Sequence, residues 1–165
     1  MRKYGIVLAL VVVSVAVWVA SASAITSPQT FNLFGASAQN TPPMNGFMFQ
    51  RPPRPGDQLQ IVDTLYKWSG SKRGAKVGHT NGILTFMTLT GGQGGTAMVN
   101  AQITLPAGTV IVEGIIRFPG SGPAHFTLPI VGGSGSYDNA RGTVNIRDIG
   151  NGDLNKSNYQ FHLLP

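Results

Sequence analysis

Apolar and polar residues alternate along much of the chain beyond residue 57. The alternation is clearest in segment 96–105, where every second residue is apolar: Ala97, Val99, Ala101, Ile103 and Leu105. These side chains would share one face of an extended chain, and the residues between them would share the other. A period of two therefore predicts a β-strand that buries one face against a core.

Similar segments recur along the whole chain after residue 24. They predict roughly eight strands, at residues 25–34, 57–66, 79–90, 96–105, 109–118, 124–131, 142–149 and 158–164. The segments 67–78 and 91–95, rich in Gly, indicate turns. No segment shows a helical period, so we predict an all-β domain, either an antiparallel sandwich or a closed barrel. A barrel of about this strand number can hold one small ligand.

Composition agrees with short strands and tight turns. The 165 residues include 22 Gly and 11 Pro, the two poorest helix formers, and no Cys. The absence of Cys excludes disulfides, thiol nucleophiles and Cys-based zinc sites. The three histidines, His79, His125 and His162, lack the spacing of metal ligands, so we expect no metal site.

The N-terminal segment 1–24 has the three parts of a secretory signal. Arg2 and Lys3 precede an apolar run, and small residues end at Ala24, after which we expect cleavage. The rival interpretation is a membrane anchor, because the run is near the lower length limit for a spanning helix. Cleavage would remove two cations and no acid, lower the net charge from +6 to +4, and leave a secreted protein without a stable membrane span.

The mature chain is predicted to form one domain. Residues 25–55 would contribute an N-terminal strand and a Pro-rich loop, and residues 56–165 the barrel, which residues 25–36 would join. A connection as long as 37–57 is usually functional or disordered. The densest group of cations is Lys72, Arg73 and Lys76, but no stripe interleaves them with aromatic residues, so we expect no nucleic-acid partner.

The segment 130–142, IVGGSGSYDNARG, raises the question of a phosphate-binding loop. Such a loop needs a helix after it, whereas the residues after Gly142 read as a strand. Nucleotide binding stays as a third hypothesis, which predicts a helix there. We favour a tight crossing between strands, because Gly132, Gly133, Gly135 and Gly142 permit positive φ. Arg141 would point away from the apolar face, either as a backbone clamp or in an ion pair.

Asp63 is the clearest candidate for chemistry. It falls in phase with Leu59, Ile61 and Leu65, on an apolar face where a carboxylate must be paired or hydrogen-bonded. Perturbed acids in cavities are functional candidates, although a buried Asp can also simply hold backbone amides.

Further candidates rest on weaker patterns. Glu113 and Arg117 share one strand face, but apolar residues on both faces of that strand leave open which face is inside. Tyr66, His125 and Tyr137 are candidate ligand-binding groups at a cavity mouth.

The order of several elements resembles a known superfamily. GDQLQIVDTLYKWSGSKRGAKVGHTNGILTF, at 56–86, resembles the first half of the allene oxide cyclase barrel. The second half of the chain, with HFTLPIVGGSGSYDNARG, resembles that barrel and, more closely, the dirigent proteins. The resemblance implies an eight-stranded antiparallel calycin-like barrel, a homotrimer, an apolar cavity and no cofactor. In this family such barrels hold a substrate in one conformation while it cyclises, isomerises or couples.

Individual positions favour dirigent-like chemistry over allene oxide cyclase activity. Asp63 falls where the cyclases have a cavity Asn and where dirigents often have Asp. The resemblance places Leu84 at the cyclases' Cys, and Ile115 and Ile116 at their cavity Tyr. Their first-strand Glu has no acidic counterpart in 25–34.

Two hypotheses follow for the function. The favoured one is a secreted dirigent-like barrel that binds a small apolar or phenolic molecule and steers its cyclisation, isomerisation or coupling. Asp63, Glu113 and Arg117 would be catalytic, and Tyr66, His125 and Tyr137 would bind the ligand. The alternative is a non-catalytic extracellular ligand-binding or structural module. A filled interior would favour the alternative, and an open interior with Asp63 on its wall the first.

Overall fold

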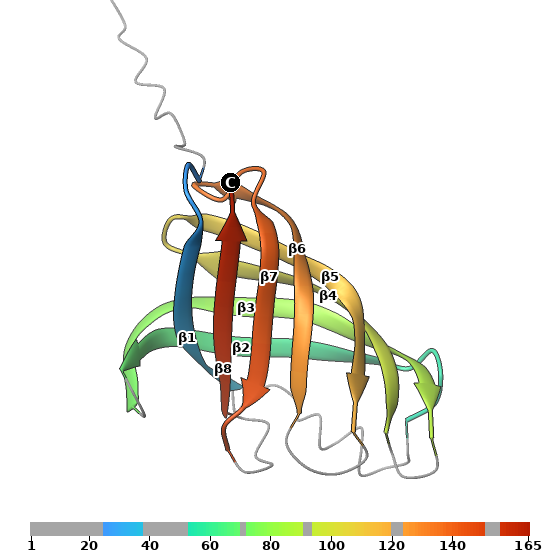
Figure 1. Cartoon of the computed structure of the whole chain (residues 1–165). Helices are drawn as coiled ribbons and strands as arrows, with labels where there is room; N and C mark the ends of the chain where they lie inside the picture. The colour runs from blue at the N-terminus through green and yellow to red at the C-terminus, as the bar shows by residue number, and fades with distance from the viewer. Residues whose placement is uncertain (1–24, 38–52, 70–71, 91–93, 120–123, 151–155) are drawn as a thin grey trace, which may run out of the picture.

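The polypeptide forms a closed antiparallel barrel of eight strands (Figure 1). The computed structural model describes residues 25–37, 53–69, 72–90, 94–119, 124–150 and 156–165. The strands are β1 (Gln29–Ser37), β2 (Gln58–Ser69), β3 (Lys72–Leu89), β4 (Gly95–Leu105), β5 (Gly108–Phe118), β6 (His125–Gly135), β7 (Arg141–Asp148) and β8 (Lys156–Leu164). Each strand pairs with the next, and β1 pairs with β8. The predicted eight-stranded antiparallel barrel is confirmed.

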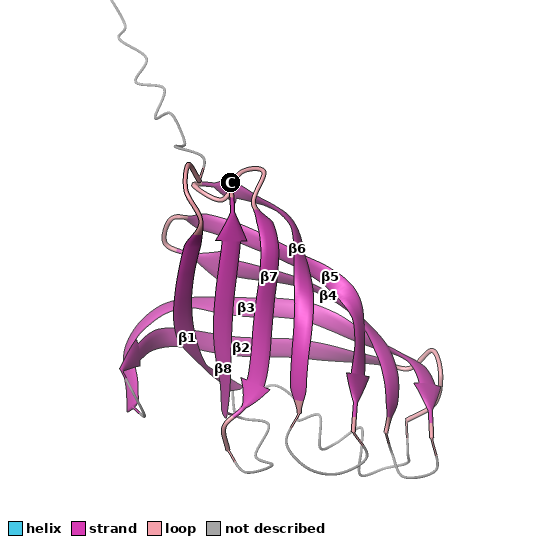
Figure 2. Cartoon of the chain, in the orientation of Figure 1, coloured by secondary structure: helices cyan, strands magenta, loops and turns pink. Residues whose placement is uncertain are grey.

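The described residues contain strands, turns and loops (Figure 2). None of them forms a helix long and apolar enough to cross a membrane. The predicted signal segment 1–24 and most of the Pro-rich connection 37–57 lie outside the described residues.

The largest difference from the sequence prediction is at 67–78. This segment was expected to be a turn, but β2 continues to Ser69 and β3 begins at Lys72. The two strands keep pairing through register shifts on either side of Tyr66. Such bulges absorb extra residues and increase the local twist, which explains how a Gly- and Lys-rich stretch stays in the sheet. Figure 1 shows the far ends of β2 and β3 curling beyond β1.

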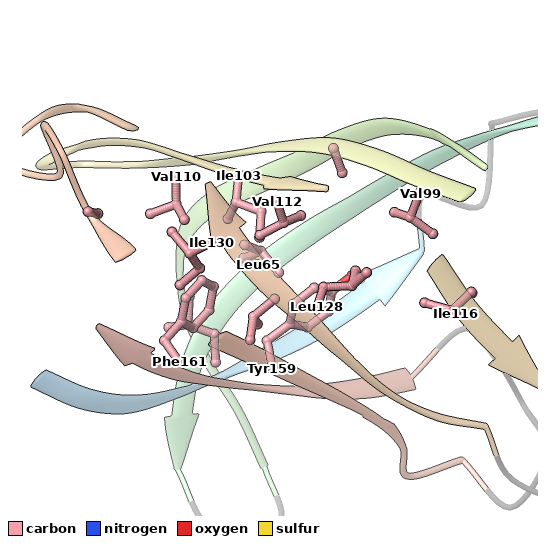
Figure 3. Packing of buried hydrophobic residues seen from close by; sticks show 14 of the residues in the cluster. Leu65, Val99, Ile103, Val110, Val112, Ile116, Leu128, Ile130, Tyr159 and Phe161 are labelled. Atoms are coloured by element: carbon pink, nitrogen blue, oxygen red, sulfur yellow. The ribbon is translucent and has the colours of Figure 1, made fainter. Parts of the chain in front are cut away.

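The core lies inside the barrel. We call the end where β2, β4, β6 and β8 finish the upper end (top and left in Figure 1), and the opposite end the lower end (lower right in Figure 1). Leu65, Ile103, Val110 and Phe161 are fully buried at or toward the upper end (Figure 3). The Phe161 ring stacks on Phe31 with centroids 4.8 Å apart. Burial of each such side chain stabilises the fold by about 1.5–3 kcal/mol.

The Gly-rich segment 130–142 forms the end of β6, a turn and the start of β7. Gly142 has φ +124°, and a Cβ there would overlap the carbonyl oxygen of His162. The Arg141 guanidinium donates to the carbonyl oxygens of Ala140 and Val131, at 2.9 and 3.2 Å. Arg141 is therefore a backbone clamp on the outer face. Because β7 is a strand, the nucleotide-binding hypothesis, which required a helix after Gly142, is wrong.

Candidate functional site

A carboxylate and a phenol meet inside the barrel. Asp63 points inward from β2 in phase with Leu59 and Leu65, as predicted, and is 9% exposed. Its Oδ2 atom accepts a short hydrogen bond from the Tyr159 hydroxyl of β8. Its Oδ1 atom accepts a second one from the Ser37 hydroxyl at the end of β1, at 2.8 Å. The carboxylate is thus held by donors from two neighbouring strands.

Tyr159 reaches Asp63 because β1 carries a glycine between them. Tyr159 alternates with Phe161 and Leu163 on the inner face of β8 and is 2% exposed. Its ring lies across Gly35, where any Cβ atom would overlap the ring. Gly35 therefore allows a β8 side chain to cross β1 and contact β2.

The Tyr159 phenol is held in its neutral form. Burial raises its pKa well above 10.0, and the charge and hydrogen bond of Asp63 raise it further. The nearby Thr80 hydroxyl acts in the opposite direction and lowers the pKa. At neutral pH the phenol is therefore a hydrogen-bond donor to the carboxylate.

Thr80 adds a polar group without a partner to the same cluster. It pairs with Asp63 across β2 and β3, so both side chains point inward. Thr80 is 3% exposed, and among the described residues its Oγ1 atom makes no hydrogen bond of standard geometry, even to the nearby phenol. A buried hydroxyl left unsatisfied costs about 1–3 kcal/mol, so a bound water or ligand at this atom would stabilise the site.

The apolar side chains inside the barrel differ in how far they are buried. Ile61, Phe118, Phe126 and Ile146 pack against the core in the lower half yet remain partly exposed. Phe31, Val77 and Tyr137 do the same in the upper half. Phe86, Ala97 and Ile116 are buried in the lower half, as Leu65, Ile103 and Val110 are in the upper half. Apolar side chains are thus buried at both ends of the barrel, and partly exposed ones also occur at both ends.

Asp148 is a second inward carboxylate at the lower end, which the sequence reasoning missed. It is 6% exposed, and its Oδ1 atom accepts a hydrogen bond from the Gly150 amide at 2.7 Å. The signal was available, because Asp148 alternates with Val144 and Ile146.

The other predicted site residues do not join Asp63. Glu113 is half-buried and Arg117 exposed on the outer face of β5. Tyr66 lies on the outer face of β2, and His125 is exposed at the start of β6. Tyr137 packs against the core at the upper end, where burial raises its pKa.

A hollow of about 560 Å³ lies on the outer face of β2, β3 and β4. Amide side chains dominate its lining: Gln58, Gln60, Asn81, Asn100 and Gln102. Amides bind polar groups but supply no acid or base at neutral pH, so the hollow offers no proton chemistry. Among the described residues, no group of His, Asp and Glu side chains could hold a metal ion.

Known proteins share this barrel. Pyocyanin demethylase matches with 23% identity and a TM-score of 0.62, over 82% of this chain and 100% of the demethylase. A pterocarpan synthase dirigent protein matches with 13% identity and a TM-score of 0.59, over 84% of this chain and 94% of its own. An exo-specific intermolecular Diels-Alderase matches with 19% identity and a TM-score of 0.59, over 83% of this chain and 98% of its own.

At these identities the likeness establishes a shared fold. No curated protein matches the chain with significant similarity. The family described as allene oxide cyclase barrel like domain matches residues 50–161, which is more than half of the chain. The barrel architecture and this match together show that the protein belongs to the allene oxide cyclase barrel-like family.

Proposed function

We propose that the interior of the barrel binds a small apolar or phenolic molecule and steers its cyclisation, isomerisation or coupling. The observation that carries the proposal is the inward Asp63–Tyr159 pair beside the unpartnered Thr80 hydroxyl. The same barrel occurs in a pterocarpan synthase dirigent protein and in a Diels-Alderase, which supports a role in ring formation or coupling.

Asp63 would act chiefly through its charge. A carboxylate in an apolar interior stabilises positive charge that develops on a bound molecule, and it accepts a proton from a ligand hydroxyl. Tyr159 and Ser37 fix the orientation of the carboxylate, so little reorganisation is needed during reaction. Thr80 would bind a polar atom of the ligand, while the apolar wall excludes water. Most of the rate effect would come from holding reacting atoms close together.

The second candidate is a ligand-binding or structural module without catalysis. It is favoured by the hydrogen bonds that already satisfy both oxygens of Asp63. Both candidates place the protein outside the cell, on the strength of the predicted signal segment 1–24. N-terminal sequencing of the exported protein tests this, because cleavage as proposed leaves Ile25 as the first residue.

We also propose that copies of the chain form a homotrimer through the outer face of β3, β4 and β5. Large apolar side chains are exposed there: Ile83, Met98, Ile111 and Ile115. Met98 and Ile115 pair directly across β4 and β5, and exposed apolar residues that lie together mark interaction surfaces. Glu113 and Arg117 flank Ile115 on the same face, so the carboxylate of one copy can pair with the guanidinium of the next.

The binding step is tested with 2-naphthol, a small neutral phenol, by isothermal titration calorimetry. We expect Asp63→Asn to weaken binding about tenfold, because a hydrogen bond to a charged group contributes about 1.5–3 kcal/mol. The matched control is Asp138→Asn in the exposed turn between β6 and β7, which should leave the affinity unchanged. An equal loss of affinity in both variants would contradict the proposed site. So would an affinity that Asp63→Asn leaves unchanged.

The steering step is tested with the same phenol and an added oxidant. Laccase and oxygen remove one electron and one proton from each 2-naphthol, and two radicals couple through a carbon–carbon bond to a product with axial chirality. Free coupling gives equal amounts of the two enantiomers. We expect an enantiomeric excess with the protein and none with Asp63→Asn, measured by chiral chromatography. Binding without any excess would favour the non-catalytic candidate.

A further inference from the structure

A second cluster of aromatic side chains lies outside the barrel. Phe34 is 8% exposed but does not belong to the core cluster, because it points outward from β1. Its ring lies 6.4 Å from that of Tyr66, edge to face, and 6.2 Å from that of Trp68. Tyr66 and Trp68 remain partly exposed, so the three rings form a half-open platform on the outer sheet.

Cations surround this aromatic platform. The Arg73 guanidinium lies over the Tyr66 ring, 4.5 Å from its centroid. Lys76 pairs with Tyr66 across β2 and β3, and Arg147 of β7 extends the same row beyond β8. All three cations are exposed.

The Asp and Glu side chains of the described residues lie away from the aromatic platform. Asp63 and Asp148 point inward, and Glu113 lies on β5. Asp57 precedes β2, and Asp138 lies in the turn between β6 and β7. The face of β1, β2 and β8 that holds the aromatic platform is therefore positive and has no acidic side chain among the described residues.

An unpartnered acceptor lies beside the platform. Asn158 of β8 pairs directly with Phe34 on one side and with Arg147 on the other. Its Oδ1 atom is buried and has no hydrogen-bond partner among the described residues. Because this oxygen is buried, the Asn158 side chain has to turn outward before a ligand hydroxyl can donate to it. A ligand with hydroxyl donors would then satisfy an acceptor that is otherwise unpaired.

We propose that this surface, formed by Phe34, Tyr66, Trp68, Arg73, Lys76, Arg147 and Asn158, binds an anionic polysaccharide built of uronic acids. The carbon–hydrogen face of a sugar ring packs on an aromatic ring. Tyr and Trp rings suit such a surface, because each also carries a polar group that can remain in contact with water. Guanidinium and ammonium groups pair with the sugar carboxylates, and sugar hydroxyls donate to amide oxygens.

The arrangement of the rings favours a sugar over two other polyanions. Single-stranded nucleic acids stack successive bases on rings spaced along a groove, whereas these three rings pack against one another as one platform. Insertion into a membrane surface needs apolar side chains that project outward, whereas Trp68 lies partly covered against Phe34. The proposal is independent of the barrel interior, so its failure leaves the proposed function untouched.

The test is calorimetric binding of polygalacturonate to the full chain, at low and moderate salt. We expect binding that weakens as salt rises, because exposed charges are screened. Trp68→Ala should weaken it about tenfold, and Arg73→Gln about threefold. Trp68→Phe should retain most of the affinity, which separates loss of the ring from loss of the fold. Arg54→Gln removes an exposed cation just before β2, at the end of the strand opposite Trp68, and should change the affinity less than twofold.

Several results would overturn the proposal. One is absence of binding at low salt by a wild type whose thermal unfolding shows that it is folded. Another is equal loss of affinity in Arg73→Gln and Arg54→Gln, which would mean non-specific attraction to net charge. Tighter, Trp68-dependent binding of oligothymidylate or of phosphatidylglycerol vesicles would assign the surface to nucleic acid or to membrane instead.

Discussion

Tyr159→Phe removes one buried oxygen and leaves the ring in place. Because the ring is 2% exposed and lies across Gly35, the packing of the variant should match that of the wild type. The substitution removes the hydrogen bond to the Oδ2 atom of Asp63 and leaves the hydrogen bond from Ser37 to its Oδ1 atom. Loss of a hydrogen bond to a charged group lowers the free energy of unfolding by about 1.5–3 kcal/mol.

That loss is large relative to the stability of an ordinary domain, about 5–15 kcal/mol. With a urea m-value of about 2 kcal/mol per molar, a loss of about 2 kcal/mol lowers the unfolding midpoint by about 1 M. Equilibrium urea unfolding at pH 7, followed by circular dichroism, measures it. Tyr66→Phe on the outer face is the control and should change the free energy by less than about 0.5 kcal/mol.

The pH dependence supplies an independent check with a defined sign. The folded-state pKa of Tyr159 lies well above the ordinary value of 10.0, so its contribution is fully present below pH 10. As the pH rises further, the unfolded state releases the proton and the folded state retains it, so stability is lost. At pH 11 the wild-type advantage over Tyr159→Phe should shrink by about 1.4 kcal/mol. Equal stability at pH 7, or an advantage that stays constant up to pH 11, would refute the buried phenol–carboxylate pair.

Three further substitutions test separate parts of the structure. Gly35→Ala should displace the Tyr159 ring and lower the thermal unfolding temperature by several degrees, for a loss of about 1–3 kcal/mol; an unchanged temperature would mean that the ring does not cross β1. Thr80→Val should be neutral or stabilising by up to about 1 kcal/mol in urea unfolding, since it removes an unpartnered hydroxyl, yet weaken 2-naphthol binding; a clear loss of stability would show that the hydroxyl has a partner. Ile115→Glu should shift the protein from trimer to monomer in sedimentation equilibrium, and a wild type that is already monomeric would contradict the proposed assembly.

The sequence predicted most of the fold because alternation is a local signal. The period of two identified the strands and placed Asp63 inside and Arg141 outside without any long-range information. Among the glycines of segment 130–142, Gly135 and Gly142 have positive φ, whereas Gly132 and Gly133 lie within β6 and do not.

Other features depend on contacts that the sequence does not display. Asp63 and Tyr159 lie 96 positions apart, so only closure of β1 on β8 and the register of the strands bring them together. The inner face of β5 could not be assigned from the sequence, because Ile111 and Ile115 are as apolar as Val112 and Ile116. In the structure Ile111 and Ile115 lie on the outer face and are exposed. The outer aromatic platform was missed because 67–78 was expected to be a turn, which would have separated Trp68 from Phe34.

The proposed function requires that a small molecule binds inside the barrel against Asp63. The most direct test is a crystal structure of the protein soaked with 2-naphthol, with Asp63→Asn as the comparison. The proposed site predicts the naphthol ring inside the barrel, with its hydroxyl within hydrogen-bond distance of Asp63 or Thr80, and loss of occupancy in the variant. A naphthol bound only outside the barrel, with the interior closed by the protein's own side chains, would contradict the claim.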